Sequence, residues 1–157
     1  MSTFGMPPTL ENPSLSPNPA LQAVASARVR IGAKWFYWIA GLSLVNSIVV
    51  ISGGQFHFVV GLGVTSVVDE LARQIGSAGV VLDLVINGLV AGLFALFGYF
   101  GCKAQKWAFV MGMALYLLDG LLLLMVKDIF SVAFHAYALY AIYRGFSHID
   151  EAVPVTA

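Results

Sequence analysis

Charged side chains are scarce in this sequence, and three long stretches have none. Asp, Glu, Lys and Arg make up 10% of the 157 residues, against about 25% in typical soluble domains, while hydrophobic residues make up 59%. No charged residue occurs in 35–68, 84–102 or 129–143. A chain this small cannot hide so much apolar surface from water, and about 20 apolar residues span a bilayer as a helix. The sequence therefore predicts an integral membrane protein in contact with the lipid bilayer.

Several kinds of chemistry lack the residues that they need. Cys102 is the only cysteine, so an intrachain disulfide and a cysteine-rich metal site are excluded. The sequence has no H-E-x-x-H helix and no G-x-S-x-G turn. A metal site of two histidines and a carboxylate would require His57 to fold back onto His135. The net charge is zero, so nothing points to nucleic acid. We expect a non-enzymatic protein without metal or cofactor, although an intramembrane enzyme stays open.

The remaining pattern predicts four spans and two tails. The tail 1–19 is rich in proline and is expected to be disordered. The membrane domain, 20–146, begins with a leading helix over 20–33 and has spans at about 34–51, 79–101, 107–126 and 129–146. Because the connections 102–106 and 127–128 are short, the helices that they join should be antiparallel neighbours. A polar C-terminal tail, expected to fray, follows over 147–157. The expected fold class is all-α integral membrane, a four-transmembrane-helix antiparallel bundle with one interfacial amphipathic helix.

The interfacial helix is predicted at about 64–76, between the first two spans. Apolar residues recur there at helical spacing, and charged residues occupy the other side. The apolar set is Val64, Val67, Val68, Leu71 and Ile75, and the charged set is Asp69, Glu70 and Arg73. This pattern is typical of a helix lying in the plane of the membrane surface with its apolar face buried. The preceding segment, 55–62, is expected to be extended or to dip into the membrane.

The positions of the cations predict the orientation. With the N-terminus in the cytoplasm, six of the eight cations lie inside: Arg28, Arg30, Lys34, Lys103, Lys106 and Arg144. The outside then holds Arg73 and Lys127. This distribution obeys the positive-inside rule, and four spans place both termini in the cytoplasm. The general layout resembles that of small four-span membrane proteins of bacteria, which implies a location in the bacterial inner membrane.

A candidate polar cluster lies within the predicted spans, and it consists of Asn46, Asp83, Asn87, Asp119 and His135. A charged side chain in a bilayer costs at least about 2.5–3.5 kcal/mol, so these residues need partners. Asp119 and His135 lie at nearly equal distances from the Lys127-Asp128 turn. Helical rise therefore places them at equal depth on adjacent helices, and we expect their carboxylate and ring to be in contact, with Asp83 or Asn87 close enough for a third contact.

Two interpretations of this cluster remain. In the first it only holds the helices together, as buried polar groups often do in membrane bundles. The protein would then act by assembling with itself, as a homo-oligomer, or with a larger membrane complex. In the second the cluster binds a proton, a cation or a small polar ligand, and the protein is a carrier or sensor.

Overall fold

The computed structural model describes residues 18–52, 62–64, 67, 74 and 77–152. Every regular element in this part of the chain is α-helical, and no strand occurs in it. Four long helices, α1, α3, α4 and α5, are followed by one short helix, α6. Their bounds are Pro19–Ile51, Ser77–Cys102, Lys106–Met125, Ile129–Phe146 and Ile149–Ala152, in that order. The expected all-α class is confirmed for the described residues.

Helix α1 is continuous, and it includes both the leading helix predicted over 20–33 and the first span predicted at about 34–51. The side chain of Asn18 accepts a hydrogen bond from the backbone N–H of Ala20 at 3.0 Å, and so satisfies a donor that a helix start leaves free. Pro19 occupies the first helical position, where its missing N–H is not needed. The helix then runs for 33 residues. Its cationic first half and its apolar second half therefore form one rod about 50 Å long.

The two hairpin connections end their helices in the same way. Ala104 and Lys127 have φ angles of 57° and 61°, the left-handed conformation that often closes a helix C-terminus. In each turn the next residue, Gln105 or Asp128, donates its N–H at 3.1 Å to the carbonyl of the residue five positions earlier. The chain therefore reverses between consecutive helices, and α4 packs against both α3 and α5, as the short connections predict.

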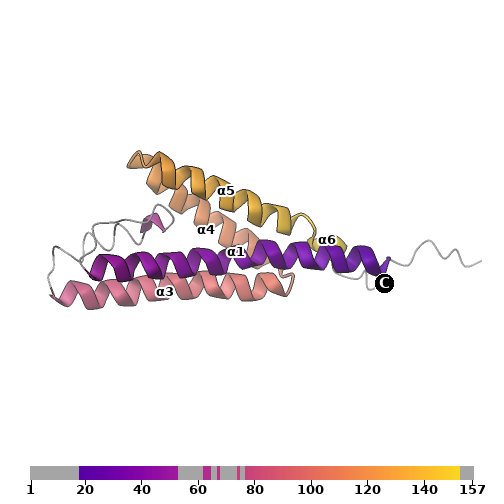
Figure 1. Ribbon diagram of the computed structural model, residues 1–157, viewed down its shortest axis with the longest axis horizontal. Helices are drawn as coiled ribbons and strands as arrows, with labels where there is room; N and C mark the ends of the chain where they lie inside the picture. The colour runs from indigo at the N-terminus through magenta and orange to yellow at the C-terminus, as the bar shows by residue number, and fades with distance from the viewer. Residues whose placement is uncertain (1–17, 53–61, 65–66, 68–73, 75–76, 153–157) are drawn as a thin grey trace, which may run out of the picture.

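Figure 1 shows the helices as two antiparallel pairs. Helix α1 lies along α3, α4 lies along α5, and the two pairs separate towards the α4–α5 turn. At the opposite end their backbones are in direct contact, because a Cβ on Gly32 would lie 2.6 Å from the Cα of Gly145. Only glycine permits so close an approach. The segment 62–64 lies between the pairs at the end where they separate (Figure 1).

Aromatic rings fill the interior between the pairs. The ring of Phe36 in α1 lies 5.9–6.3 Å, between centroids, from the rings of Phe94 and Phe97 in α3 and of Phe109 in α4. Gly112 provides the space for Phe36, since a Cβ at this position would lie 2.5 Å from that ring. Such aromatic pairs contribute about 0.5–1.5 kcal/mol each beyond burial. Three helices are therefore joined at this centre.

Two helices have the length and composition needed to cross a membrane. They are α3, over Leu84–Cys102, and α4, over its whole length. No other helix among the described residues meets the same requirement. The structure thus contains two candidate spans, and the four-span arrangement stays a prediction.

Two other segments were also predicted from the sequence. Beyond Ser147, where a fraying tail was expected, α6 packs against α1 and buries Ile149, so that expectation is wrong for 149–152. Of the predicted interfacial helix, Val64, Val67 and Gln74 are described, and all three are helical. Val67, which was expected to face the membrane interior, is 51% exposed on the protein itself, and its burial in a membrane stays a prediction. The other residues of 65–76, and the tail up to residue 17, lie outside the described residues.

Candidate functional site at the α4–α5 turn

The predicted contact between Asp119 of α4 and His135 of α5 is present. Nε2 of the imidazole lies 2.8 Å from Oδ2 of the carboxylate. The two residues are 5% and 2% exposed. Equal distance from the turn set their equal depth, and the cost of leaving a charge unpaired away from water explains why they face each other.

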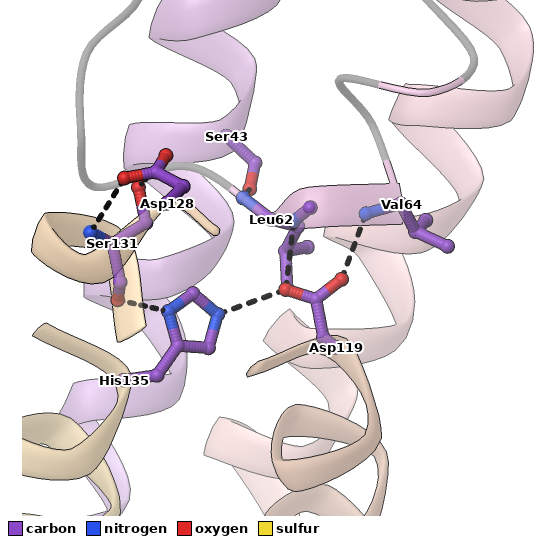
Figure 2. A network of polar contacts seen from close by, with 8 residues as sticks. Ser43, Leu62, Val64, Asp119, Asp128, Ser131 and His135 are labelled. Carbon is purple, nitrogen blue, oxygen red and sulfur yellow. Dashed lines mark hydrogen bonds and ion pairs between the residues drawn. The ribbon is translucent and has the colours of Figure 1, made fainter. Parts of the chain in front are cut away.

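The Asp119 carboxylate also holds the segment that lies between the helix pairs (Figure 2). Oδ2 accepts a hydrogen bond from the backbone N–H of Gly63 at 2.7 Å, and Oδ1 accepts one from that of Val64 at 2.8 Å. Both residues are helical, and such N–H groups at the start of a helix favour a negative partner. We call Asp119, His135, Gly63 and Val64 the Asp119 junction.

Gly63 and Leu62 fit this position for different reasons. A Cβ on Gly63 would lie 2.7 Å from Cγ of Leu123, so a larger residue would push the segment away from α4. Leu62 is buried, and its backbone N–H donates to Oγ of Ser43 in α1 at 3.2 Å. The segment is therefore bound to both helix pairs, to α1 through Ser43 and to α4 through Asp119.

Hydrogen bonding limits the protonation states of the pair. Nδ1 of His135 lies 2.8 Å from the carbonyl oxygen of Ser131, which can only accept, so Nδ1 carries a proton. Nε2 of His135 and Oδ2 of Asp119 then share one further proton between them. The pair is neutral as a whole whichever atom holds that proton. Because both carboxylate oxygens already accept from backbone N–H groups, the ring is taken as the donor to Oδ2.

Two neighbours fix the position of the His135 ring. Asp128 caps the start of α5 by accepting hydrogen bonds from the backbone N–H of Ser131 at 3.1 Å and from its hydroxyl at 2.6 Å. This cap holds the first turn, whose Ser131 carbonyl meets the imidazole. On one face of the ring, Tyr116 stacks at 4.1 Å between centroids with an interplanar angle of 15°. Tyr116 is 1% exposed, and its hydroxyl has no hydrogen-bond partner among the described residues.

The other members of the candidate polar cluster behave differently. Asn87 is buried in α3 and donates its side-chain amide to Oγ of Ser47 in α1 at 2.8 Å. It therefore joins the two helices of the first pair. Asn46 is buried on the same side of α1 as Ser47. The side chain of Asp83 lies outside the described part of the structure, so its predicted contact is untested.

A groove reaches the Asp119 junction from the side of α3 and α4. Its volume is about 220 Å³, and Asp119 is the one ionisable residue among the described residues that line it. The other lining residues are apolar: Leu62, Val64, Val90, Leu93, Phe94, Leu115, Leu118 and Leu122. The three donors on the carboxylate come from the chain itself. Among the described residues, no group of three or more His, Cys, Asp and Glu side chains is arranged to hold a metal ion.

Sequence reasoning missed the partners that are backbone groups. The N–H groups of Gly63 and Val64 have no side-chain signature, and the only hint of close packing was the glycine itself. The Asp128 cap was detectable, because an aspartate directly before an apolar helical run is a typical helix start. Comparisons with known protein families, with characterised proteins and with solved structures found no match for this chain.

Proposed function

We propose that this chain is a non-enzymatic integral membrane protein of four spans that acts by assembling with itself or with a larger membrane complex. The observation that carries the proposal is a large exposed hydrophobic surface around a core that also contains polar side chains. Among the residues with at most 5% exposure are Ser43, Asn46, Asn87, Asp119 and His135, while 32 large hydrophobic residues of the described part of the chain are exposed. A protein surrounded by lipid tolerates that surface, whereas water opposes it.

The two candidate spans support a bilayer rather than the interior of a soluble protein. Only 33% of the most apolar stretch of α3 and 39% of that of α4 are buried within the protein. A core helix of a soluble domain would be mostly covered by its own chain. Helices α1 and α5 present similar apolar residues outward, such as Ile48 and Phe130, and they complete the proposed four spans. With six cations inside and two outside, both termini lie in the cytoplasm, and we propose the bacterial inner membrane as the location.

The membrane arrangement is tested by fractionation and by reporter fusions. The full-length chain should remain with membranes after alkaline carbonate washing and should be released by detergent. Reporters fused after Lys127 should map to the periplasm, and reporters fused after Lys103 or Ser147 to the cytoplasm. Release of the chain by carbonate would contradict the proposal. A reporter fused after Lys127 that is active in the cytoplasm would contradict it as well.

Self-assembly is supported by the outward face of α3. A Cβ added to Gly88 or Gly92 would meet no atom within 4 Å, and Val85 and Leu89 beside them are exposed. A Gly-x-x-x-Gly pair on a membrane helix lets a second helix approach closely. This face is therefore where we place contact with a second copy.

The matched test uses three glycines. The Gly88→Leu, Gly92→Leu double variant should shift the protein in nanodiscs to lower mass by native mass spectrometry. Gly41→Leu, at another glycine with open space around it, should leave the mass unchanged. A wild-type chain that stays monomeric in every lipid composition contradicts self-assembly.

The carrier or sensor alternative is favoured by one specific observation, the buried Tyr116 hydroxyl without a hydrogen-bond partner among the described residues. Such a group is costly, and it belongs to the ring that stacks on His135. In liposomes with a pH gradient, a carrier would show proton or cation flux that Asp119→Asn abolishes while the protein stays folded. The assembly proposal expects no flux from the wild type and a loss of stability in the variant.

A further inference from the structure

A second cavity lies at the opposite end of the helices from the Asp119 junction, and it combines cationic and apolar walls. It has a volume of about 340 Å³ and lies between α1 and α5, within the range of about 300–1,000 Å³ typical of small-ligand sites. Its cationic wall includes Arg28 and Arg144, with His148 beside them, and its apolar wall includes Ile31, Trp35 and Tyr137. We propose that this cavity binds one anionic phospholipid, with the phosphate between the two arginines.

The arginines are suited to a phosphate because their donors are largely available. Nη1 of Arg28 lies 3.0 Å from Nε2 of His148, and since a guanidinium can only donate, His148 accepts there. Nδ1 of His148 in turn lies 3.2 Å from Oε2 of Glu151. These two hydrogen bonds, from Glu151 through His148 to Arg28, position one edge of the guanidinium. The other N–H groups of Arg28 are left for a ligand. The Arg144 guanidinium makes no ion pair with a carboxylate among the described residues, and its Cζ lies 6.0 Å from the centroid of the Tyr140 ring.

The local charge matches a phosphodiester. Arg28 and Arg144 contribute two positive charges, Glu151 contributes one negative charge, and His148 is neutral when it accepts from Arg28. The other nearby acid, Asp150, pairs with Lys106. The cavity therefore has a net charge of about +1, which one phosphodiester neutralises. Arginine also matches phosphate geometry through its fork of donors.

The apolar wall continues from the arginines in one direction along both helices. On α1, Ile31 and Trp35 follow Arg28 at successive turns, and on α5, Tyr137 precedes Arg144 by two turns. Trp35 and Tyr137 meet edge to face at 5.4 Å between ring centroids. A headgroup at the arginines would thus lay its glycerol and acyl chain along these rings, as aromatic residues at a membrane surface favour. Free phosphate would leave this wall without a partner, so a lipid fits the whole cavity better.

This inference rests on the proposed membrane location, and it places the lipid on the cytoplasmic side. Basic pockets between membrane helices on that side are suited to acidic headgroups. The glycine contact between Gly32 and Gly145 lies at the same crossing, and α6 packs on α1 beside it. A bound lipid would therefore link the two helix pairs at a point where they already touch.

The test measures lipid binding to the full-length protein in detergent by native mass spectrometry. Palmitoyl-oleoyl phosphatidylglycerol should bind as a single tightly held copy, at least about tenfold more tightly than the zwitterionic phosphatidylcholine with the same chains. Arg144→Gln should weaken the binding of phosphatidylglycerol about tenfold, which is the loss expected for one charge-assisted hydrogen bond. Arg30→Gln, which removes an exposed cation of α1 outside the cavity, should change the affinity by less than about twofold.

A second readout guards against a folding defect in the variants. In a Trp38→Phe, Trp107→Phe background, phosphatidylglycerol with brominated acyl chains should quench Trp35 fluorescence, and Arg28→Lys should retain part of that quenching. Equal losses in Arg30→Gln and Arg144→Gln would show diffuse charge attraction and overturn the site. Binding of inorganic phosphate as tight as that of the lipid, or no preference over phosphatidylcholine, would overturn it as well. Membrane fractionation of the same samples separates these outcomes from failure of the proposed location, since a chain that stays in membranes without the preference contradicts only the lipid site.

Discussion

Replacing Asp119 with leucine is expected to destabilise the fold strongly. The substitution removes the acceptor for three donors, the backbone N–H groups of Gly63 and Val64 and the His135 ring. Each buried donor left without a partner costs about 1–3 kcal/mol. These costs do not add fully, and breaking a buried pair by removing one partner typically costs about 3–5 kcal/mol. We therefore expect Asp119→Leu to lower the free energy of unfolding by about 3–5 kcal/mol.

Asparagine at the same position separates the loss of charge from the loss of hydrogen bonds. With its NH₂ group at the position of Oδ2 it can donate to Nε2 of a neutral His135, and its carbonyl oxygen at the position of Oδ1 keeps the bond from Val64, but the NH₂ group cannot accept from Gly63. Asp119→Asn should therefore cost about 1–3 kcal/mol, less than leucine. Asp150→Asn is the matched control, because the Asp150 side chain is 81% exposed, and its pair with lysine is worth at most about 1 kcal/mol.

The assay combines unfolding in nanodiscs with amide hydrogen exchange of the peptide that covers 62–64. In Asp119→Leu, exchange of the Gly63 and Val64 amides should accelerate at least about tenfold, the equivalent of about 1.4 kcal/mol. The aromatic centre around Phe36 should keep its protection if the damage is local. The role assigned to the junction would be refuted if the amides at 63–64 exchanged in Asp119→Leu at the same rate as in the wild type. It would also be refuted if Asp119→Leu and Asp150→Asn were equally stable.

Three further predictions concern the backbone and the topology. Gly145→Ala should lower the free energy of unfolding by about 1–3 kcal/mol, because its Cβ would lie 2.7 Å from a backbone atom of α1, whereas Gly41→Ala, with open space around it, should stabilise by up to about 1 kcal/mol; both are measured by unfolding in nanodiscs. Ala104→Gly should stabilise by about 1 kcal/mol in the same assay, since φ is 57° at this position; a loss of stability would show that the turn relaxes otherwise. Cysteine labelling in a Cys102→Ser background should reach Lys127→Cys only from outside the cell and Lys103→Cys only from inside, and the reverse result would invert the orientation.

The sequence predicted the Asp119–His135 contact because two independent constraints agreed. Counting residues from the tight turn places Asp119 and His135 at the same level along their helices. The cost of leaving a charge unpaired predicts that the two side chains point towards each other. The third contact, expected from Asp83 or Asn87, stays a prediction, because the side chain of Asp83 lies outside the described part of the structure. A helical face tells which residues point the same way, but not how a helix is rotated relative to a particular neighbour. Because α3 pairs with α1, Asn87 donates to Ser47, a partner that counting from the turn could not give.

The parts that sequence reasoning missed are those with no repeating pattern. The segment 62–64 is too short for periodicity, and it acts through N–H groups that every residue except proline carries. Helix α6 is also too short to show a buried face, although Ile149 is buried on α1. The four long helices, in contrast, were located to within a few residues at most ends, because absence of charge over a long run is a strong signal. The start of α1 agrees as well, because the helix predicted over 20–33 begins within one residue of Pro19.

The two helix pairs are fastened in different ways at their two ends. At the α1–α5 crossing the fastening is steric, since Gly32 and Gly145 allow backbone contact. At the other end the pairs separate, and polar bonds hold segment 62–64 between them, from Ser43 on one side and Asp119 on the other. In the proposed membrane location, apolar contact alone gives the helices little reason to associate, because the acyl chains of lipids are equally apolar. Polar bonds do not have that competitor. Asp119 is therefore buried at the end of the bundle where packing alone would not hold the helix pairs together. Loss of the Asp119 junction should separate the pairs at that end, while the contact between Gly32 and Gly145 stays intact.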